Sequence, residues 1–115
     1  MKVTYDATRL MKCAQFIWAH NPSALDWGPD SFVELGQRIL NEAIEQAKQN
    51  AKILKENRRL RDFGHEIHND WVDSVSTGGY TLYFTHEDDT IHVEFLVDPA
   101  IGLDSSQRNP VQVHI

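Results

Sequence analysis

The sequence contains little of what marks a secreted or membrane-spanning protein. Its 115 residues include a single cysteine, Cys13, so no disulfide can form within the chain, and we expect a reducing compartment, the cytoplasm. No apolar run approaches the roughly 20 residues that span a bilayer. Residues 1–6 also lack the apolar core of a signal peptide. The sequence therefore predicts a soluble cytoplasmic protein without a membrane partner.

Motifs that mark a catalytic or cofactor site are also missing. No serine stands in a G-x-S-x-G context, and the glycine pair Gly78-Gly79 is too short for a phosphate-binding loop. The acidic stretch Glu87-Asp88-Asp89 lacks the ligand spacing and the glycine of a calcium loop, so a solvated turn is favoured. No cofactor is expected, and the sequence favours a protein that is not an enzyme.

Histidine is the one metal-binding residue type present in a high number. Among the 6 histidines, His65 and His68 lie three positions apart, beside Glu66 and Asp70. On a helix the two rings would share a face, but H-E-x-H is one residue short of the zinc-binding pattern H-E-x-x-H. Histidine near a helix end also complements the helix dipole as a cation. We interpret these residues as a solvated helix end and expect no metal.

What the sequence does contain is the composition of an acidic globular domain. Hydrophobic residues make up 41% and charged residues 24%, which is enough apolar surface to build a core. We expect a single domain over residues 1–115. The 17 acidic and 11 basic residues give a net charge of −6, which argues against nucleic acid as the main partner.

The longest expected element is an amphipathic helix over residues 31–62. Ser31 and Glu34 fit a capping box, in which each side chain bonds a free backbone amide of the first turn. Gly64 supplies the stop signal, because glycine readily adopts the left-handed conformation that ends many helices. Such a helix is about 45 Å long, more than a small domain normally covers.

Two stripes run along this helix at helical spacing. The apolar stripe comprises Val33, Leu40, Ile44, Ala47, Ala51 and Leu54, and the basic stripe, expected to be a solvated face, comprises Lys48, Lys52, Lys55 and Arg59. We hypothesise that two copies pair through the apolar stripe, with Leu40, Ala47 and Leu54 in the interface. Arg58 would then need an acidic partner across the interface. The alternative is a monomer in which the chain after Gly64 folds back along the stripe.

Shorter elements are predicted on both sides of the long helix. Asp6 is the expected N-cap of a helix over residues 7–20, whose helical spacing places Cys13 in the core. Farther along, Ile67, Trp71 and Val75 follow one another at intervals of four, which favours another helical piece over 65–75. The alternative for this stretch is a loop that leads to a strand over residues 71–76.

The last third of the chain has the period-two alternation of strands. Residues 80–86 and 90–97 predict a β-hairpin around the acidic turn. Its helix-facing side comprises Leu82, Phe84, Val93 and Phe95. Residues 111–115 alternate again and predict a last strand, and Val3 with Tyr5 predicts an edge strand. The expected fold class is α+β, with the N-terminal helix and the long helix packed on one face of a small antiparallel sheet.

Three functional hypotheses follow, and the least favoured is a nucleic-acid-associated factor that uses the basic stripe. The favoured one is a non-enzymatic binding or regulatory protein, an inhibitor or adaptor, whose partner is another protein or a second copy of itself. The alternative is a small-molecule-binding domain or enzyme with a pocket between sheet and helices. Its candidate lining comprises Trp18, Trp27, Trp71 and Tyr83. The first hypothesis predicts an exposed recognition surface, and the second predicts an enclosed cavity with a few convergent polar groups.

Overall fold

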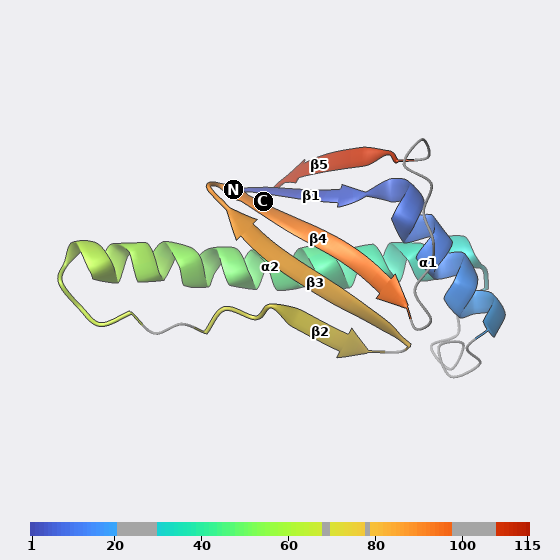
Figure 1. Cartoon of the computed structure of the whole chain (residues 1–115), viewed down its shortest axis with the longest axis horizontal. Coiled ribbons are helices and arrows are strands. Elements are labelled where there is room, and N and C mark those ends of the chain that lie inside the picture. The colour runs from blue at the N-terminus through green and yellow to red at the C-terminus, as the bar shows by residue number, and fades with distance from the viewer. Residues whose placement is uncertain (21–29, 68–69, 78, 98–107) are drawn as a thin grey trace.

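A computed structural model describes residues 1–20, 30–67, 70–77, 79–97 and 108–115. Over these residues the chain forms an α+β domain, as predicted. The elements are β1 (Lys2–Asp6), α1 (Ala7–His20), α2 (Phe32–Asp62), β2 (Ser74–Thr77), β3 (Tyr80–Glu87), β4 (Thr90–Val97) and β5 (Pro110–His114). Figure 1 shows α2 lying across one face of the sheet and continuing past the turn between β3 and β4.

The predicted hairpin forms the middle of a five-stranded sheet with the order β2-β3-β4-β1-β5. β3 and β4 pair antiparallel with Leu82 opposite Phe95, and both side chains are buried against the helices. The tight turn at Asp88 and Asp89 requires a positive φ of 52° at Asp88, which a short polar side chain tolerates better than a bulky one. The hairpin prediction is therefore confirmed, including the side that faces the core.

β1 lies inside the sheet, so the prediction of an edge strand at Val3 and Tyr5 is wrong in its position. Val3 pairs with Ile91 in the parallel neighbour β4 and with Val113 in the antiparallel neighbour β5. Two alternating apolar residues indicate a strand, but they do not indicate how many neighbours the strand has. The last strand of the chain is confirmed as β5, and it takes the edge position instead.

α1 begins directly after β1, with the predicted N-cap. The Asp6 carboxylate accepts a hydrogen bond from the amide of Arg9 at 3.1 Å, and it also accepts one from the amide of Asn109 at 3.2 Å. Its buried face comprises Leu10, Cys13, Ala14 and Ile17, as the helical spacing indicates. Gly36 of α2 lies against this helix, because a Cβ at that position would stand only 3.4 Å from the Cβ of Ala14.

α2 also begins and ends at the predicted signals. The Ser31 hydroxyl accepts a hydrogen bond from the amide of Glu34 at 3.3 Å, which confirms the N-cap. The Glu34 carboxylate bonds the amide of Asp30 at 2.8 Å, one residue before the position that a capping box requires. At the other end Gly64 has a φ of 75°, the conformation that favours glycine after a helix.

The buried face of α2 differs from the predicted apolar stripe. Its buried residues are Leu35, Gly36, Ile39, Ala43, Ala47 and Asn50. Only Ala47 belongs to both sets, and Val33 is 57% exposed. Leu40, Ile44 and Ala51 lie to one side of the buried face and are half-buried, and Leu54 is half-buried near the end of the helix. The predicted stripe is rotated about the helix axis, by part of a turn, from the face that is buried. Apolar residues cover a wide arc of α2, and its sequence does not show which part of that arc the sheet covers.

The described part of the segment after α2 contains no helix, so the predicted helical piece over 65–75 is wrong. Residues 65–67 and 70–73 form no helix, and β2 begins at Ser74. Side chains four positions apart share a face on a strand as well as on a helix, so the spacing of Ile67, Trp71 and Val75 fits both structures. Trp71 and Val75 pack against the core, which agrees with the alternative that the chain returns and completes its own core.

Candidate binding site

The side of α2 that faces β2 and β3, here named the closed flank, is fixed to neighbouring segments by hydrogen bonds. The Tyr80 hydroxyl donates to the Glu42 carboxylate at 2.6 Å. The buried Asn50 side chain donates to the carbonyl of Val72 at 3.1 Å and accepts from the amide of Val72 at 3.4 Å. Burial and the bond to Glu42 raise the pKa of the Tyr80 phenol. The protein's own chain therefore occupies this side of the helix.

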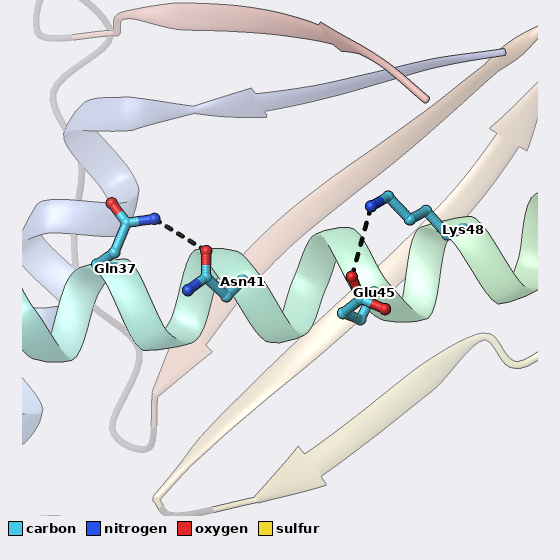
Figure 2. A network of polar contacts seen from close by, with 4 residues as sticks. All are labelled: Gln37, Asn41, Glu45 and Lys48. Carbon is cyan, nitrogen blue, oxygen red and sulfur yellow. Dashed lines mark hydrogen bonds and ion pairs between the residues drawn. The ribbon is translucent and has the colours of Figure 1, made fainter.

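The opposite side of α2, here named the open flank, forms hydrogen bonds mainly with itself. Gln37 donates to Asn41 at 2.9 Å, and Lys48 pairs with Glu45 at 3.5 Å. Figure 2 shows these four side chains on α2, with Gln37 and Lys48 extending in the direction of β1. Helical spacing places on the same flank the half-buried residues Leu40, Ile44 and Ala51. Apolar side chains on this flank are therefore only partly covered.

A cleft of about 710 Å³ opens where the open flank meets the ends of β1 and β5 and the turn between β3 and β4. We name it the basic cleft. Its basic residues, all from α2, are Lys48, Lys52, Lys55 and Arg58. Its apolar residues are Met1, Ala51 and Ile115, and its acidic residues are Glu45 and Asp89. The cleft thus combines a row of cations on one helix with an apolar patch from both ends of the described chain.

The positive charge of the basic cleft is only partly neutralised by the protein itself. Glu45 pairs with Lys48, and Asp89 lies 3.7 Å from the amino group of Met1. The other three basic side chains of the cleft form no hydrogen bond or ion pair with any described residue. Their donors are therefore available to an external acceptor, in a protein whose net charge is −6.

These residue types suit a ligand that carries several negative charges and some apolar surface. Lysine presents a compact ammonium group on a flexible aliphatic stem, and arginine presents a planar fork that fits carboxylate or phosphate. The stems of such side chains cover apolar surface while their charged ends stay in water. An acidic peptide segment with aliphatic side chains combines both requirements.

A second cleft of about 560 Å³ lies on the sheet face away from α2. In it Thr4 and His92, which are neighbours on β1 and β4, form a hydrogen bond between the hydroxyl and Nδ1. Two arginines and two carboxylates line this cleft, namely Arg9, Arg108, Asp6 and Glu94. The opposite charges are equal in number, so this surface selects an anionic ligand less strongly than the basic cleft does.

The aromatic residues predicted to line a ligand pocket are not brought together. Trp18 stands edge-on to Phe32, with ring centroids 6.5 Å apart, where α1 meets the start of α2. Trp71 lies near His86, with ring centroids 6.0 Å apart, on the inner face of the sheet. Tyr83 is 45% exposed on the outer face. Trp27 lies outside the described residues. A single pocket therefore cannot contain the three described aromatic side chains.

The residues predicted for a dimer interface lie in different environments. Ala47 is fully buried under the sheet of its own chain, so it cannot contact a second copy unless the core opens. Leu40 is half-buried and packs against this core. Leu54 and Arg58 lie near the end of α2, where they line a smaller cleft together with Ile67. Arg58 also lines the basic cleft, and pairing of two copies through these residues stays a prediction.

The described residues contain no group of three or more histidine, cysteine, aspartate or glutamate side chains that could hold a metal ion. His65 is exposed after the end of α2, and His68 lies outside the described residues. In the part of the chain that the structure describes, neither helix is long and apolar enough to cross a membrane.

The sequence pattern alone does not identify the basic cleft as a site. The regular spacing of Lys48, Lys52 and Lys55 is visible in the sequence, but it also fits a solvated face. The apolar patch comes from Met1 and Ile115, which the pairing of β1 with β5 brings together from distant parts of the chain. Comparisons with protein-family models, with curated proteins and with solved structures find no match to this chain.

Proposed function

We propose that this protein is a non-enzymatic binding protein that recognises an acidic segment of a partner protein through the basic cleft. The observation that carries the proposal is the row of basic side chains on the open flank, three of them without a partner among the described residues. The rest of the chain is acidic, with a net charge of −6 overall. A partner's acidic segment is therefore attracted to the cleft and repelled by the remaining surface, which orients the two proteins.

A labelled polyglutamate peptide tests this proposal by fluorescence anisotropy. We expect binding that weakens as salt is added, because exposed charges are screened. The double substitution Lys52→Glu and Lys55→Glu should abolish it. Arg38→Glu is the control for charge reversal outside the cleft, to be compared with each single lysine substitution as well, since Arg38 is an exposed cation of the same helix that does not line the cleft. The proposal fails if the wild type and the double variant bind polyglutamate equally, or if Arg38→Glu has the same effect as the double variant.

A small anionic ligand is the alternative, and the volume of the cleft favours it. About 710 Å³ lies within the range of about 300–1,000 Å³ that small-molecule sites occupy. Calorimetric titration with inorganic pyrophosphate separates the two functions. The binding-protein proposal predicts weak binding that polyglutamate displaces at much lower concentration, whereas a small-molecule site would bind pyrophosphate more tightly than the peptide.

Self-association is the other form of protein binding that the open flank supports. Leu40 and Ile44 are only partly covered there, and a second copy would remove them from water. Light scattering at micromolar concentration measures the mass, and Leu40→Asp should dissociate such a dimer. We also propose that the protein acts in the reducing cytoplasm, because its single cysteine, Cys13, is a free thiol.

A further inference from the structure

β5 is an edge strand of the described sheet, and one side of it is open. It pairs antiparallel with β1, with Val113 opposite Val3 and Val111 opposite Tyr5, and no strand of the described residues pairs with its other side. An open strand edge presents unpaired backbone amides and carbonyls, which another chain can use as a template.

The pairing with β1 shows which backbone groups of β5 face outward. Ala7 donates from its amide to the carbonyl of Asn109 at 2.8 Å, and Ile115 donates to the carbonyl of Met1 at 3.0 Å. In an antiparallel pair, bonded residues alternate along each strand, so the odd-numbered residues of β5 bond β1. The amides and carbonyls of Gln112 and His114 therefore point away from β1.

Pro110 also has its backbone directed away from β1. Proline has no backbone N–H, but at this position no hydrogen bond to β1 is lost. Pro110 removes one outward donor at the start of β5, but the rest of the strand has neither proline nor lysine, two of the devices that protect open edges from other chains. The opposite edge of the sheet, β2, has 4 residues against 5 in β5, and a shorter edge offers fewer bonds. β5 is therefore the better template for an added strand.

The open edge leads into the basic cleft. Ile115 follows β5 directly and lines the cleft together with Lys48 and Lys52 of α2. The side chains of Val111 and Val113 are only half-buried, so an added strand would cover them further. One end of a chain segment that pairs with β5 would thus reach the unpartnered basic side chains of the basic cleft.

From this continuity we infer that the partner's acidic segment binds as an extended strand, added to the sheet along β5. The inference rests on the proposed function and specifies its mode. The added strand bonds the outward amides and carbonyls of Gln112 and His114. Alternate apolar side chains of the segment lie beside Val111 and Val113, and its acidic residues, at the end near Ile115, meet the basic side chains of α2. Main-chain bonds give affinity in this mode, and side chains give specificity.

The test uses a synthetic peptide in which alternating valines and threonines are flanked by glutamates on both sides, so that either strand direction is served. Amide hydrogen exchange, followed by NMR, should be slowed at least tenfold at Gln112 and His114 when the peptide is bound. In the free protein these two amides should exchange faster than those of Val111 and Val113, which bond β1. Unchanged exchange at Gln112 and His114 in the presence of bound peptide would overturn the inference.

A pair of variants tests the same backbone group by affinity. Gln112→Pro removes the outward amide and leaves the bonds to β1, whereas Gln112→Ala keeps the amide and removes only the side chain. We expect about a tenfold weaker peptide affinity for Gln112→Pro, which corresponds to about 1.4 kcal/mol for one backbone bond, and little change for Gln112→Ala. Equal affinities of the two variants would contradict strand addition. Amide exchange at Val113 shows whether Gln112→Pro folds. If it does not fold, the amide exchange of Gln112 and His114 in the wild type with bound peptide decides whether a strand is added.

The same experiments distinguish failure of the binding mode from failure of the function. If Lys52→Glu with Lys55→Glu abolishes binding while the two outward amides stay unprotected, the acidic segment binds the cleft without adding a strand. If neither polyglutamate nor the strand peptide binds, both proposals fail. If the amides are already protected without peptide, and protection increases with protein concentration, a second copy of this chain occupies the edge and the inference is overturned.

Discussion

The two flanks of α2 have similar polar residue types and opposite structural roles. On the closed flank, Glu42 and Asn50 bond Tyr80 and the backbone of Val72, which lie far away in the sequence. On the open flank, Asn41 and Glu45 bond residues of the same helix three or four positions away. The first set fixes the position of other segments, and the second set leaves the helix surface accessible.

This difference shows that the environment of a polar side chain decides its role. A buried amide must find partners, because an unsatisfied polar group in the interior costs about 1–3 kcal/mol. Asn50 is completely buried, and its bonds to Val72 hold the segment that returns along α2. An exposed amide such as that of Asn41 exchanges its partner with water at little cost. The basic side chains of the open flank are exposed in the same way as Asn41, and they can therefore exchange water for a ligand.

The largest expected effect concerns the core on which both flanks depend. Phe95 is buried in the hydrophobic core, so Phe95→Ala should lower the free energy of unfolding by about 3–5 kcal/mol, because it leaves a cavity. Denaturant unfolding measures this change. A loss much smaller than that of Asn50→Ala would mean that the closed flank, and not the shared core, carries most of the stability.

Substitution of one asparagine on each flank tests most directly whether the closed flank contributes more to stability than the open flank. Asn50→Ala leaves the amide and carbonyl of Val72 without their side-chain partner, so we expect a loss of about 1–3 kcal/mol in the free energy of unfolding. Asn41→Ala removes only an exposed bond to Gln37 and should cost less than about 0.5 kcal/mol. Similar losses for the two variants would contradict the assignment of a closed and an open flank.

Alkaline pH should destabilise the fold through Cys13 and the closed flank. Burial raises the pKa of the Cys13 thiol from 9.0 to about 12, and the pKa of the Tyr80 phenol is raised as well. Both groups stay protonated in the fold at a pH at which they ionise in the unfolded chain. The contribution of Cys13 is complete below pH 9 and is lost as the pH rises toward 12, whereas that of Tyr80 begins to fall only above pH 10.

For Cys13 the decrease is at most about 1.4 kcal/mol per pH unit. Denaturant unfolding at a series of pH values above 9 measures the slope. Cys13→Ala should show a smaller slope than the wild type. An unchanged slope would mean that the thiol does not contribute.

The smallest expected effect on stability lies on the open flank. Glu45→Gln removes the exposed ion pair with Lys48, so the free energy of unfolding should change by less than about 0.5 kcal/mol. The same substitution removes one negative charge from the basic cleft and should strengthen polyglutamate binding. Thermal unfolding and anisotropy measure the two quantities separately. Weaker peptide binding in Glu45→Gln would mean that the cleft does not act through its positive charge.

Local signals predicted most of the fold. The caps at Asp6, Ser31 and Gly64 mark helix ends, and the alternation around the acidic turn marks the hairpin, because each pattern depends on neighbours in the sequence. The errors concern long-range arrangement. The interior position of β1 and the direction in which α2 faces the sheet depend on segments that local periodicity does not contain.

The candidate site was less predictable for the same reason. The lysines of the basic cleft belong to the predicted basic stripe, but a solvated face has the same spacing. What distinguishes the cleft is the presence of Met1, Asp89 and Ile115 beside α2. These residues meet only because β1 pairs with both β4 and β5, and no motif in the sequence predicts that pairing.

The position of β1 in the sheet also restricts the order in which the chain can fold. Thr4 and His92, which bond across β1 and β4, are 88 residues apart. During synthesis β1 therefore emerges long before its two neighbours, β4 and β5. Until those strands are made, Val3 has no strand to pair with. Contacts between distant segments form slowly because a long loop must close first. We expect the two helices to associate early and the insertion of β1 between β4 and β5 to be the late step that completes the domain.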